Sequence, residues 1–228
     1  MGNILDRRQI LLAGIAGTAL TLPGCSSIPG FSMTDAIRRL LSLSSQQAFA
    51  TLLQPGGFYD SNVARIALPD RLGGSAGSGV LGAVLGSSIF RKRLQKELNR
   101  AAEKGAERAA PLVADAVRNV SIADAASIVR GGPEAATAFL RGQMGGKLID
   151  AMLPGIGGAL KLASNDVVGQ AIKSVSGFDV NALASDINTK ADNAIWKSIG
   201  AEESAIRADP QKTNDPLLIS VFGLGSRI

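Results

Sequence analysis

The chain has 228 residues, 46% of them hydrophobic and only 4% aromatic. This composition fits one domain whose core is built from small and aliphatic side chains, and it excludes a chain that is disordered along its whole length. It contains no histidine and a single cysteine, which excludes His-based zinc sites, Ser-His-Asp and Cys-His catalysis, and intrachain disulfides. The net charge of +5 is a mild excess in which Lys and Arg are mixed with Asp and Glu and lack interleaved aromatics, so no nucleic-acid partner is expected.

The first residues have the tripartite order of a secretory signal. Residues 1–8 are short and positive, residues 10–22 form an uncharged apolar run, and Leu22-Pro23-Gly24-Cys25 follows at once. The apolar run is too short for a permanent membrane span, which needs about 20 residues. The tetrapeptide resembles a lipobox, from which only Pro23 departs, so we expect Cys25 to be the lipid attachment site.

These features predict three parts of the chain. Residues 1–24 are a cleaved lipoprotein signal peptide, 25–32 are the lipidated cysteine and a tether, and 33–228 are a helical domain. Acyl chains such as palmitate on Cys25 would anchor the protein to a membrane of the bacterial cell envelope, facing the periplasm. Ser26 resembles the residue that permits sorting to an outer membrane. The alternative is that Cys25 is an ordinary buried thiol.

The route of export stays open between two systems. Residues 6–11, Asp-Arg-Arg-Gln-Ile-Leu, resemble a twin-arginine signal, but paired arginines are also common in the positive region of ordinary secretory signals.

Apolar periodicity then predicts a first helix from about Thr34 to Leu53, stopped by the Pro-Gly-Gly at residues 55–57. Residues 58–69 are the least helical stretch, and their weak alternation predicts at most a short strand or hairpin arm. Residues 72–90 carry no charge, and their glycines and serines favour a packed helix or loop over a membrane segment. The GxGxxG at residues 77–82 lacks the surrounding strands of a dinucleotide site.

The strongest helix signal covers residues 91–119, in which Pro111 should bend or break the helix. A helix that starts at Pro133 is expected to stop at Pro154, and one that begins at Phe178 and Asp179 is expected to end at Gly200, before a short separate helix over residues 201–208. The predicted fold is therefore all-α.

Several segments together resemble a bacterial family known as domain of unknown function 4197. The resemblance covers about Leu40 to Phe222, and it implies an exported, mostly helical protein without implying an activity. Ala138 departs from the more polar residue that the family tends to have. The segments are Phe58-Tyr59, Ile66-Ala67-Leu68-Pro69, Asn99-Arg100-Ala101-Ala102-Glu103, Asp124-Ala125, Ala135-Ala136-Thr137, and residues 202–210, Glu-Glu-Ser-Ala-Ile-Arg-Ala-Asp-Pro.

The last of these segments contains a candidate polar site. Glu203 and Arg207 lie one turn apart, which predicts an ion pair worth about 0.3 to 0.5 kcal/mol if it is exposed, with Asp209 fixing the turn before Pro210. Alternatively, Glu202, Glu203 and Asp209 surround a cation or polar ligand. Their spacing lacks a calcium-loop signature, so neither a metal nor a cofactor is expected.

Asn99 and Glu103 share one helix stripe and complete the candidate site. They either converge with Arg207 in a buried polar network or satisfy one another and the backbone. Carboxylates such as Glu103, Glu202 and Glu203 could also act as the acid and base of a hydrolase or lyase.

The favoured function is a non-catalytic envelope lipoprotein whose helical domain binds an envelope protein, a lipid or a small ligand. A carboxylate-based hydrolase or lyase and a purely structural protein are the alternatives. Missing nucleophile constellations make an enzyme the less favoured interpretation.

Overall fold

The computed structural model describes residues 32–68, 87–163 and 180–223. It divides into two units, residues 1–31 and 32–228, and the buried core residues of the described ranges lie between Ala36 and Phe222. Residues 32–228 therefore contain a hydrophobic core of their own. The signal peptide, Cys25, nearly all of the tether, the GxGxxG sequence and the helix start expected at residues 178–179 lie outside the described residues.

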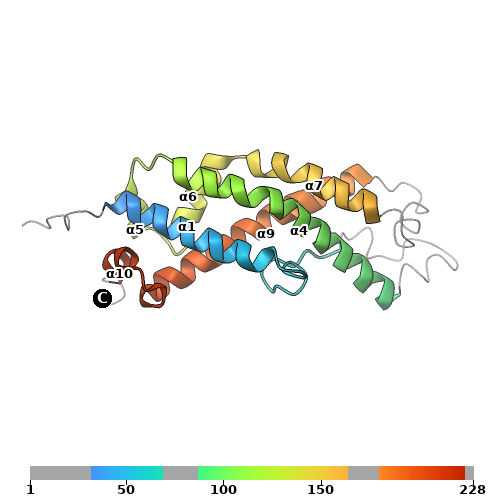
Figure 1. The fold of residues 1–228 in the computed structure, drawn as a ribbon, viewed down its shortest axis with the longest axis horizontal. Helices are drawn as coiled ribbons and strands as arrows, with labels where there is room; N and C mark the ends of the chain where they lie inside the picture. The colour runs from blue at the N-terminus through green and yellow to red at the C-terminus, as the bar shows by residue number, and fades with distance from the viewer. Residues whose placement is uncertain (1–31, 69–86, 164–179, 224–228) are drawn as a thin grey trace, which may run out of the picture. The chain divides into compact units, whose positions relative to one another are not determined.

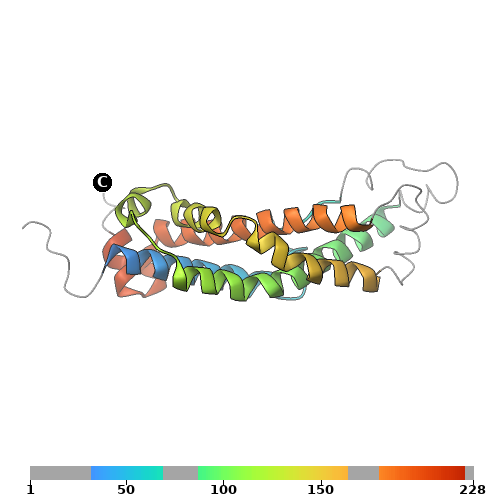
Figure 2. The same cartoon turned by 90° about the horizontal axis from the view of Figure 1, so that it is seen from above.

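Four long helices form the body of this unit, and consecutive ones run in opposite directions (Figures 1 and 2). Helix α4 packs mainly against α7, while α1 packs mainly against α9. The all-α prediction is confirmed, and the described residues include no strand. The long helices are α1 (Met33–Leu52), α4 (Ser88–Asn119), α7 (Lys147–Ala163) and α9 (Val180–Ala208).

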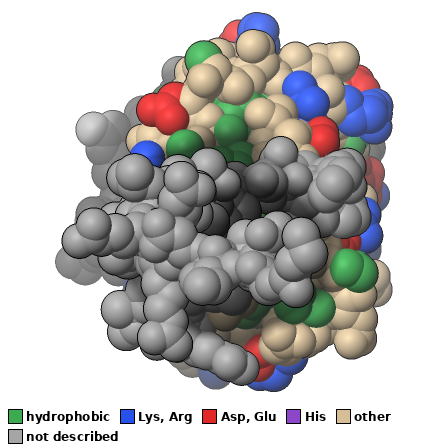
Figure 3. Space-filling model, turned by 90° about the vertical axis from the view of Figure 1, so that its left-hand side faces the viewer, with side chains coloured by type: hydrophobic (Ala, Val, Ile, Leu, Met, Phe, Trp, Pro, Cys, Tyr) green, Lys and Arg blue, Asp and Glu red, His purple; other side chains and the backbone are tan. Residues whose placement is uncertain are grey.

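Four short elements gather at the end of the bundle where α1 begins and α9 ends (Figure 1). Apolar side chains and both signs of charge are visible at this end (Figure 3). The elements are α5 (Ala125–Arg130), α6 (Ala135–Met144), the 3-10 helix η1 (Pro210–Thr213) and α10 (Pro216–Phe222). None of the described helices is both long enough and apolar enough to cross a membrane.

Small residues allow the helices to approach closely. A Cβ atom on Gly105 of α4 would lie 2.8 Å from Ile156 of α7, and one on Gly155 of α7 would lie 2.7 Å from the carbonyl oxygen of Lys104. Neither position has room for a side chain. The α4–α7 contact therefore depends on these two glycines, and the larger apolar side chains of Met152 and Ile156 lie beside Gly105.

The predicted strand or hairpin near residues 58–69 is wrong. The described part, residues 58–68, consists of turns and extended backbone without a strand partner. A β-ladder needs a neighbouring strand for its amide and carbonyl groups. Here the side chain of Asn99 supplies those bonds to Ile66 instead.

Two predicted helix ends, at Pro154 and Gly200, do not occur, and of the bend or break predicted at Pro111 the break does not occur. Helix α4 continues through Pro111, whose ring lies on the exposed side, where water can reach the unpaired carbonyl of Glu107. Helix α7 continues through Pro154. The break between helices falls earlier, at Gly145, where φ is +54°. Helix α9 continues through Gly200, which lies under the side chain of Glu134. At Pro154 and Gly200, packing of α7 against α4 and of Glu134 over α9 outweighs the local tendency.

Candidate functional site

Glu203 and Arg207 form an ion pair on α9, in which Nε of Arg207 donates to Oε1 of Glu203 over 2.7 Å. The side chain of Glu203 is fully buried and that of Arg207 is 10% exposed. The ion pair is therefore buried, and the small stabilisation expected for an exposed ion pair does not apply to it. A buried pair is costly to desolvate and needs further hydrogen bonds to both partners.

Glu203 receives those bonds from the first turn of α6. The backbone amides of Ala136 and Thr137 donate to its two carboxylate oxygens over 3.0 and 2.7 Å, and the hydroxyl of Thr137 donates over 2.6 Å. The residue that precedes α6, Glu134, makes no capping bond with its own side chain. Glu203 therefore caps α6 from another helix, where its negative charge also suits the helix dipole.

Arg207 makes the complementary contacts with the end of α5. Its two terminal nitrogens donate to the carbonyl oxygens of Ile128 and Val129 over 3.1 and 3.0 Å. The guanidinium carbon also lies 4.7 Å from the ring centre of Phe222 in α10. A cation beside the last carbonyls of a helix is favourable. The ion pair thus joins α5, α6, α9 and α10.

Asn99 holds the loop that follows α1. Its side-chain oxygen accepts from the amide of Ile66 over 2.8 Å, and its side-chain nitrogen donates to the Ile66 carbonyl over 2.9 Å and to the Gln95 carbonyl over 2.8 Å. The side chain of Asn99 is fully buried. Asn99 therefore replaces the missing neighbouring strand for one residue of the loop.

Glu103, one turn further along α4, binds the start of the same loop. Its Oε1 accepts from the amide of Gly56 over 3.1 Å. Burial raises the pKa of the Glu103 carboxyl, although hydrogen bonds from the amides of Phe58 and Gly56 partly offset this effect. Gly56 has φ of +85°, a conformation that favours glycine.

The structure places the predicted site residues in two separate clusters. Asn99 and Glu103 meet the loop after α1, whereas Glu203 and Arg207 lie near the end of α9, beside α5 and α6, at different positions along the bundle (Figure 1). In each cluster the polar side chains form hydrogen bonds mainly with backbone amide and carbonyl groups. The arrangement does not bring Glu103 and Glu203 to one shared cavity.

The two remaining candidates stand apart from these clusters. Glu202 is half-buried, and its side chain makes no hydrogen bond to another described residue. Asp209 pairs with Lys212 over 3.2 Å at the surface. Within the described ranges, no group of three or more Asp, Glu or Cys side chains is arranged to hold a metal ion.

A third polar cluster was not predicted. Arg141 of α6 donates to Asp192 of α9 over 2.8 Å, and the indole nitrogen of Trp196 donates to the other carboxylate oxygen of Asp192 over 3.0 Å. The only sequence signal was the i, i+4 spacing of Asp192 and Trp196, which is common on helices. These bonds fix α6 against α9.

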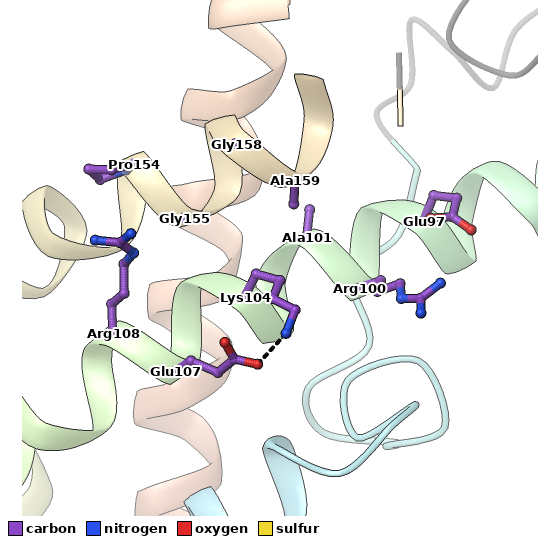
Figure 4. A pocket seen from close by; sticks show the side chains of 10 residues that line it. All are labelled: Glu97, Arg100, Ala101, Lys104, Glu107, Arg108, Pro154, Gly155, Gly158 and Ala159. Atoms are coloured by element: carbon purple, nitrogen blue, oxygen red, sulfur yellow. Dashed lines mark hydrogen bonds and ion pairs between the residues drawn. The ribbon is translucent and has the colours of Figure 1, made fainter. Parts of the chain in front are cut away.

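A groove of about 460 Å³ lies between α4 and α7 (Figure 4). Its α7 wall, from Pro154 to Ala159, carries only small side chains apart from Ile156, which points into the core. Arg108 reaches from α4 toward Gly155, while Lys104 pairs with Glu107 over 2.6 Å. The α4 side of this groove is thus lined by charged side chains that face solvent.

Comparison with known proteins gives one match. The model of a family described as a protein of unknown function, DUF4197, matches residues 27–223. No curated protein and no solved structure matches the chain.

Proposed function

Because the chain belongs to the DUF4197 family, which is defined as a protein of unknown function, we propose its function from its own residues. We propose an exported, lipid-anchored protein whose helical domain works by binding a partner and not by catalysis. The first half of this proposal rests on the amino-terminal sequence, and the second half rests on how the fold uses its carboxylates.

One observation carries the second half. Glu203 has four bonds within the fold, two from amides, one from a hydroxyl and one from Arg207, and its side chain is fully buried. A general acid or base must reach the substrate proton directly or through one water. Glu203 offers neither a free lone pair nor access, which favours a structural role for the segment that includes it.

Glu103 gives the hydrolase or lyase alternative its best support, because an acid catalyst needs a raised pKa. A carboxylate mechanism also needs a second carboxyl at the same site, with the pair about 5 to 10 Å apart in glycosidases. The nearest chain partners of Glu103 are the amides of the loop after α1, and Glu203 belongs to the other cluster. We therefore favour binding.

The best binding surface in the described part of the chain is the α4 side of the groove. Arg100, Lys104 and Arg108 recur every four residues along it, so they lie on one side of the helix. Arg100 and Lys104 are exposed, and Arg108 packs beside Gly155. Glu97 and Glu107 share the lining, and Glu107 pairs with Lys104. Arg100 and Arg108 are therefore the cations that suit a partner with negative charge.

The anchor can be tested with the full chain expressed in a bacterial host. Cys25→Ser removes the thiol that would accept the lipid, and Ser26→Ala is the matched control, since it changes the neighbouring hydroxyl and leaves the thiol. We expect the wild-type chain and Ser26→Ala to incorporate labelled palmitate and sediment with membranes. Cys25→Ser should incorporate no label and should either be released or keep its signal peptide.

Membrane retention of Cys25→Ser with normal processing would reject the lipid anchor.

Binding is tested separately by thermal unfolding of residues 32–228 with phosphate, citrate, peptidoglycan fragments and short-chain phospholipids, because a ligand of the folded state raises its stability. A shift that Arg100→Gln and Arg108→Gln abolish supports the groove. A shift abolished by Glu103→Gln alone favours the enzyme, and no shift favours a purely structural protein.

A further inference from the structure

The positive charge of this protein is concentrated in one stretch of one helix. Residues 88–108 of α4 contain seven Lys and Arg against three Glu, a net charge of +4, and the whole chain has a formal net charge of +5. The acidic and basic residues of the remaining chain nearly cancel. The excess positive charge is therefore carried mainly by this stretch of α4.

Most of these cations point to solvent, whereas one of the three glutamates does not. Glu103 is turned to the amide of Gly56, so it contributes little negative charge to the outer surface. We call the exposed set the α4 basic face. It consists of Lys92, Arg93, Lys96, Arg100, Lys104 and Arg108, whose helical spacing puts them on one side of α4, whereas Arg91 lies on the opposite side.

The first turn of α4 adds apolar surface to this charge. Ile89 is 80% exposed, more than any other large hydrophobic residue described, and Phe90 beside it is half-buried against the core. Exposing a large aliphatic side chain to water is unfavourable. An apolar side chain next to a row of cations is the arrangement by which helices lie in the headgroup region of a bilayer.

We infer that the α4 basic face, together with Ile89, binds the surface of an anionic phospholipid bilayer. The inference names the partner of the surface proposed above and in that respect rests on the proposed function. Lys and Arg attract anionic headgroups over a Debye length of about 8 to 10 Å, and Ile89 enters the boundary with the acyl chains.

A bilayer fits these observations better than a nucleic acid does. Single-stranded nucleic acids are held by aromatic side chains on which bases stack, and the described part of α4 has only Phe90, which packs on the core. Ile89 has no role in contacts with phosphates but has one at a bilayer. A lipid surface therefore explains both the charge and the exposed apolar residue, whereas a nucleic acid explains the charge alone.

The position of α4 also fits a protein held at a membrane by its other end. Helix α1 begins, just after Ser32, at the end of the bundle opposite to the start of α4 (Figures 1 and 2). With a lipid anchor before Ser32 and Ile89 in the bilayer, the two ends of the bundle would both be held at the membrane. The helices would then lie along the bilayer surface instead of standing upright on it.

The test uses residues 32–228, which contain the hydrophobic core and lack Cys25, so its outcome is independent of lipidation. Co-sedimentation is measured with vesicles of phosphatidylcholine alone and of phosphatidylcholine with 30% phosphatidylglycerol. We expect binding only to the anionic vesicles, and we expect it to disappear as sodium chloride rises from about 0.05 to 0.5 M.

Two variants that each lose four positive charges distinguish binding through the α4 basic face from a general effect of net charge. The first neutralises part of the α4 basic face with Lys92→Gln, Lys96→Gln, Arg100→Gln and Arg108→Gln. The second removes four exposed cations from other places with Arg118→Gln, Lys147→Gln, Lys197→Gln and Lys212→Gln. We expect the first to lower the vesicle partition coefficient by about tenfold or more and the second to lower it by less than about threefold.

Insertion of the first turn is measured with a fluorophore. The only cysteine of the chain is Cys25, so Ile89→Cys or Gln211→Cys provides a unique labelling site in residues 32–228. An environment-sensitive dye at residue 89 should shift to shorter emission wavelengths on anionic vesicles, and the same dye at residue 211 in η1 should not.

Three results would overturn the inference. The first is equal binding to neutral and anionic vesicles, and the second is equal loss of binding in the two charge variants. The third is complete competition by duplex DNA at the same phosphate concentration with no change in the dye at residue 89, which would identify a nucleic acid as the partner. Failure of the vesicle test leaves the Cys25 test unaffected, and the reverse also holds.

Discussion

Glu203 and Arg207 stand one helical turn apart, and the 2.7 Å bond between them lies where α5 ends and α6 begins. The anion of the pair caps the amides of α6, and the cation caps the carbonyls of α5. Two residues of α9 therefore hold a connection that lies more than 60 positions earlier in the sequence. The carboxylate that the sequence offered as a catalytic candidate is used to hold the fold together.

Removing one partner of this buried pair should strongly destabilise the domain. Arg207→Ala leaves the Glu203 carboxylate buried without its cation, which typically costs about 3 to 5 kcal/mol. We expect a loss of that size in the free energy of unfolding, measured by urea denaturation. Lys212→Ala is the control because it removes a cation from the exposed pair with Asp209, where the cost is under about 1 kcal/mol. Equal effects of the two variants would contradict the structural role.

Loss of the Asn99 side chain should release the loop after α1. In Asn99→Ala the Ile66 amide loses its partner while it remains buried, which costs about 1 to 3 kcal/mol, and the Ile66 carbonyl keeps only the bond from the Gln95 side chain. We expect faster hydrogen exchange at the Ile66 amide, measured by NMR. Asn119→Ala removes an exposed asparagine from the same helix, and it should leave the exchange of Ile66 unchanged. Protection of Ile66 in both variants would show that Asn99 does not hold the loop.

The raised pKa of Glu103 predicts a pH dependence of stability. A carboxyl whose pKa is raised by folding holds its proton more tightly in the folded state than in the unfolded state. Its contribution to stability is therefore fully present below the ordinary value near 4.5 and decreases as the pH rises through the folded-state pKa. We expect the wild-type chain to lose stability relative to Glu103→Gln as the pH rises above 4.5.

Urea denaturation of both proteins at several pH values gives this difference directly, and Glu107→Gln controls for the loss of one carboxylate from the same helix. A difference between wild type and Glu103→Gln that stays constant with pH, or that changes in the opposite direction, would show that burial does not dominate at Glu103.

Asp215 should show the opposite pH dependence. Burial opposes its ionisation, but the hydrogen bond from Arg39 and those from the amides of Leu217 and Leu218 outweigh burial and lower the pKa of Asp215. A lowered pKa contributes stability above the ordinary value near 3.8, and this contribution is lost as the pH falls through the folded-state pKa. Asp215→Asn should therefore flatten the acid side of the stability profile, whereas Asp124→Asn, at the exposed start of α5, should not.

Two glycines of α7 should respond in opposite ways to the same substitution. Gly155→Ala places a Cβ 2.7 Å from the Lys104 carbonyl, so α4 and α7 must separate, with a loss of about 1 to 3 kcal/mol. Gly158→Ala meets no atom within 4 Å, and its higher helix propensity should raise stability by up to about 1 kcal/mol. Thermal denaturation measures both. A stabilising Gly155→Ala would mean that the two helices are not in close contact there.

The sequence by itself determined the helices whose signals are local. Apolar residues at helical spacing predicted α1 to within one residue at each end, and they predicted most of α4. Such a pattern depends only on the helical period and on one side of the helix facing water. Both can be recognised from residues that lie a few positions apart. The same local reasoning identified the segments by which the chain resembles its family, and the family was confirmed.

Only the tertiary structure decided where helices continue and which polar groups meet. Pro154 and Gly200 look like helix ends, yet helix packing at these positions outweighs a propensity cost of a few kcal/mol or less. The partners of Asn99 and Glu203 lie 33 and 67 residues away, and no local pattern encodes such distances. Burial then turned the predicted surface pair of Glu203 and Arg207 into the bond that joins four helices, because a desolvated charge must find its partners wherever the fold provides them.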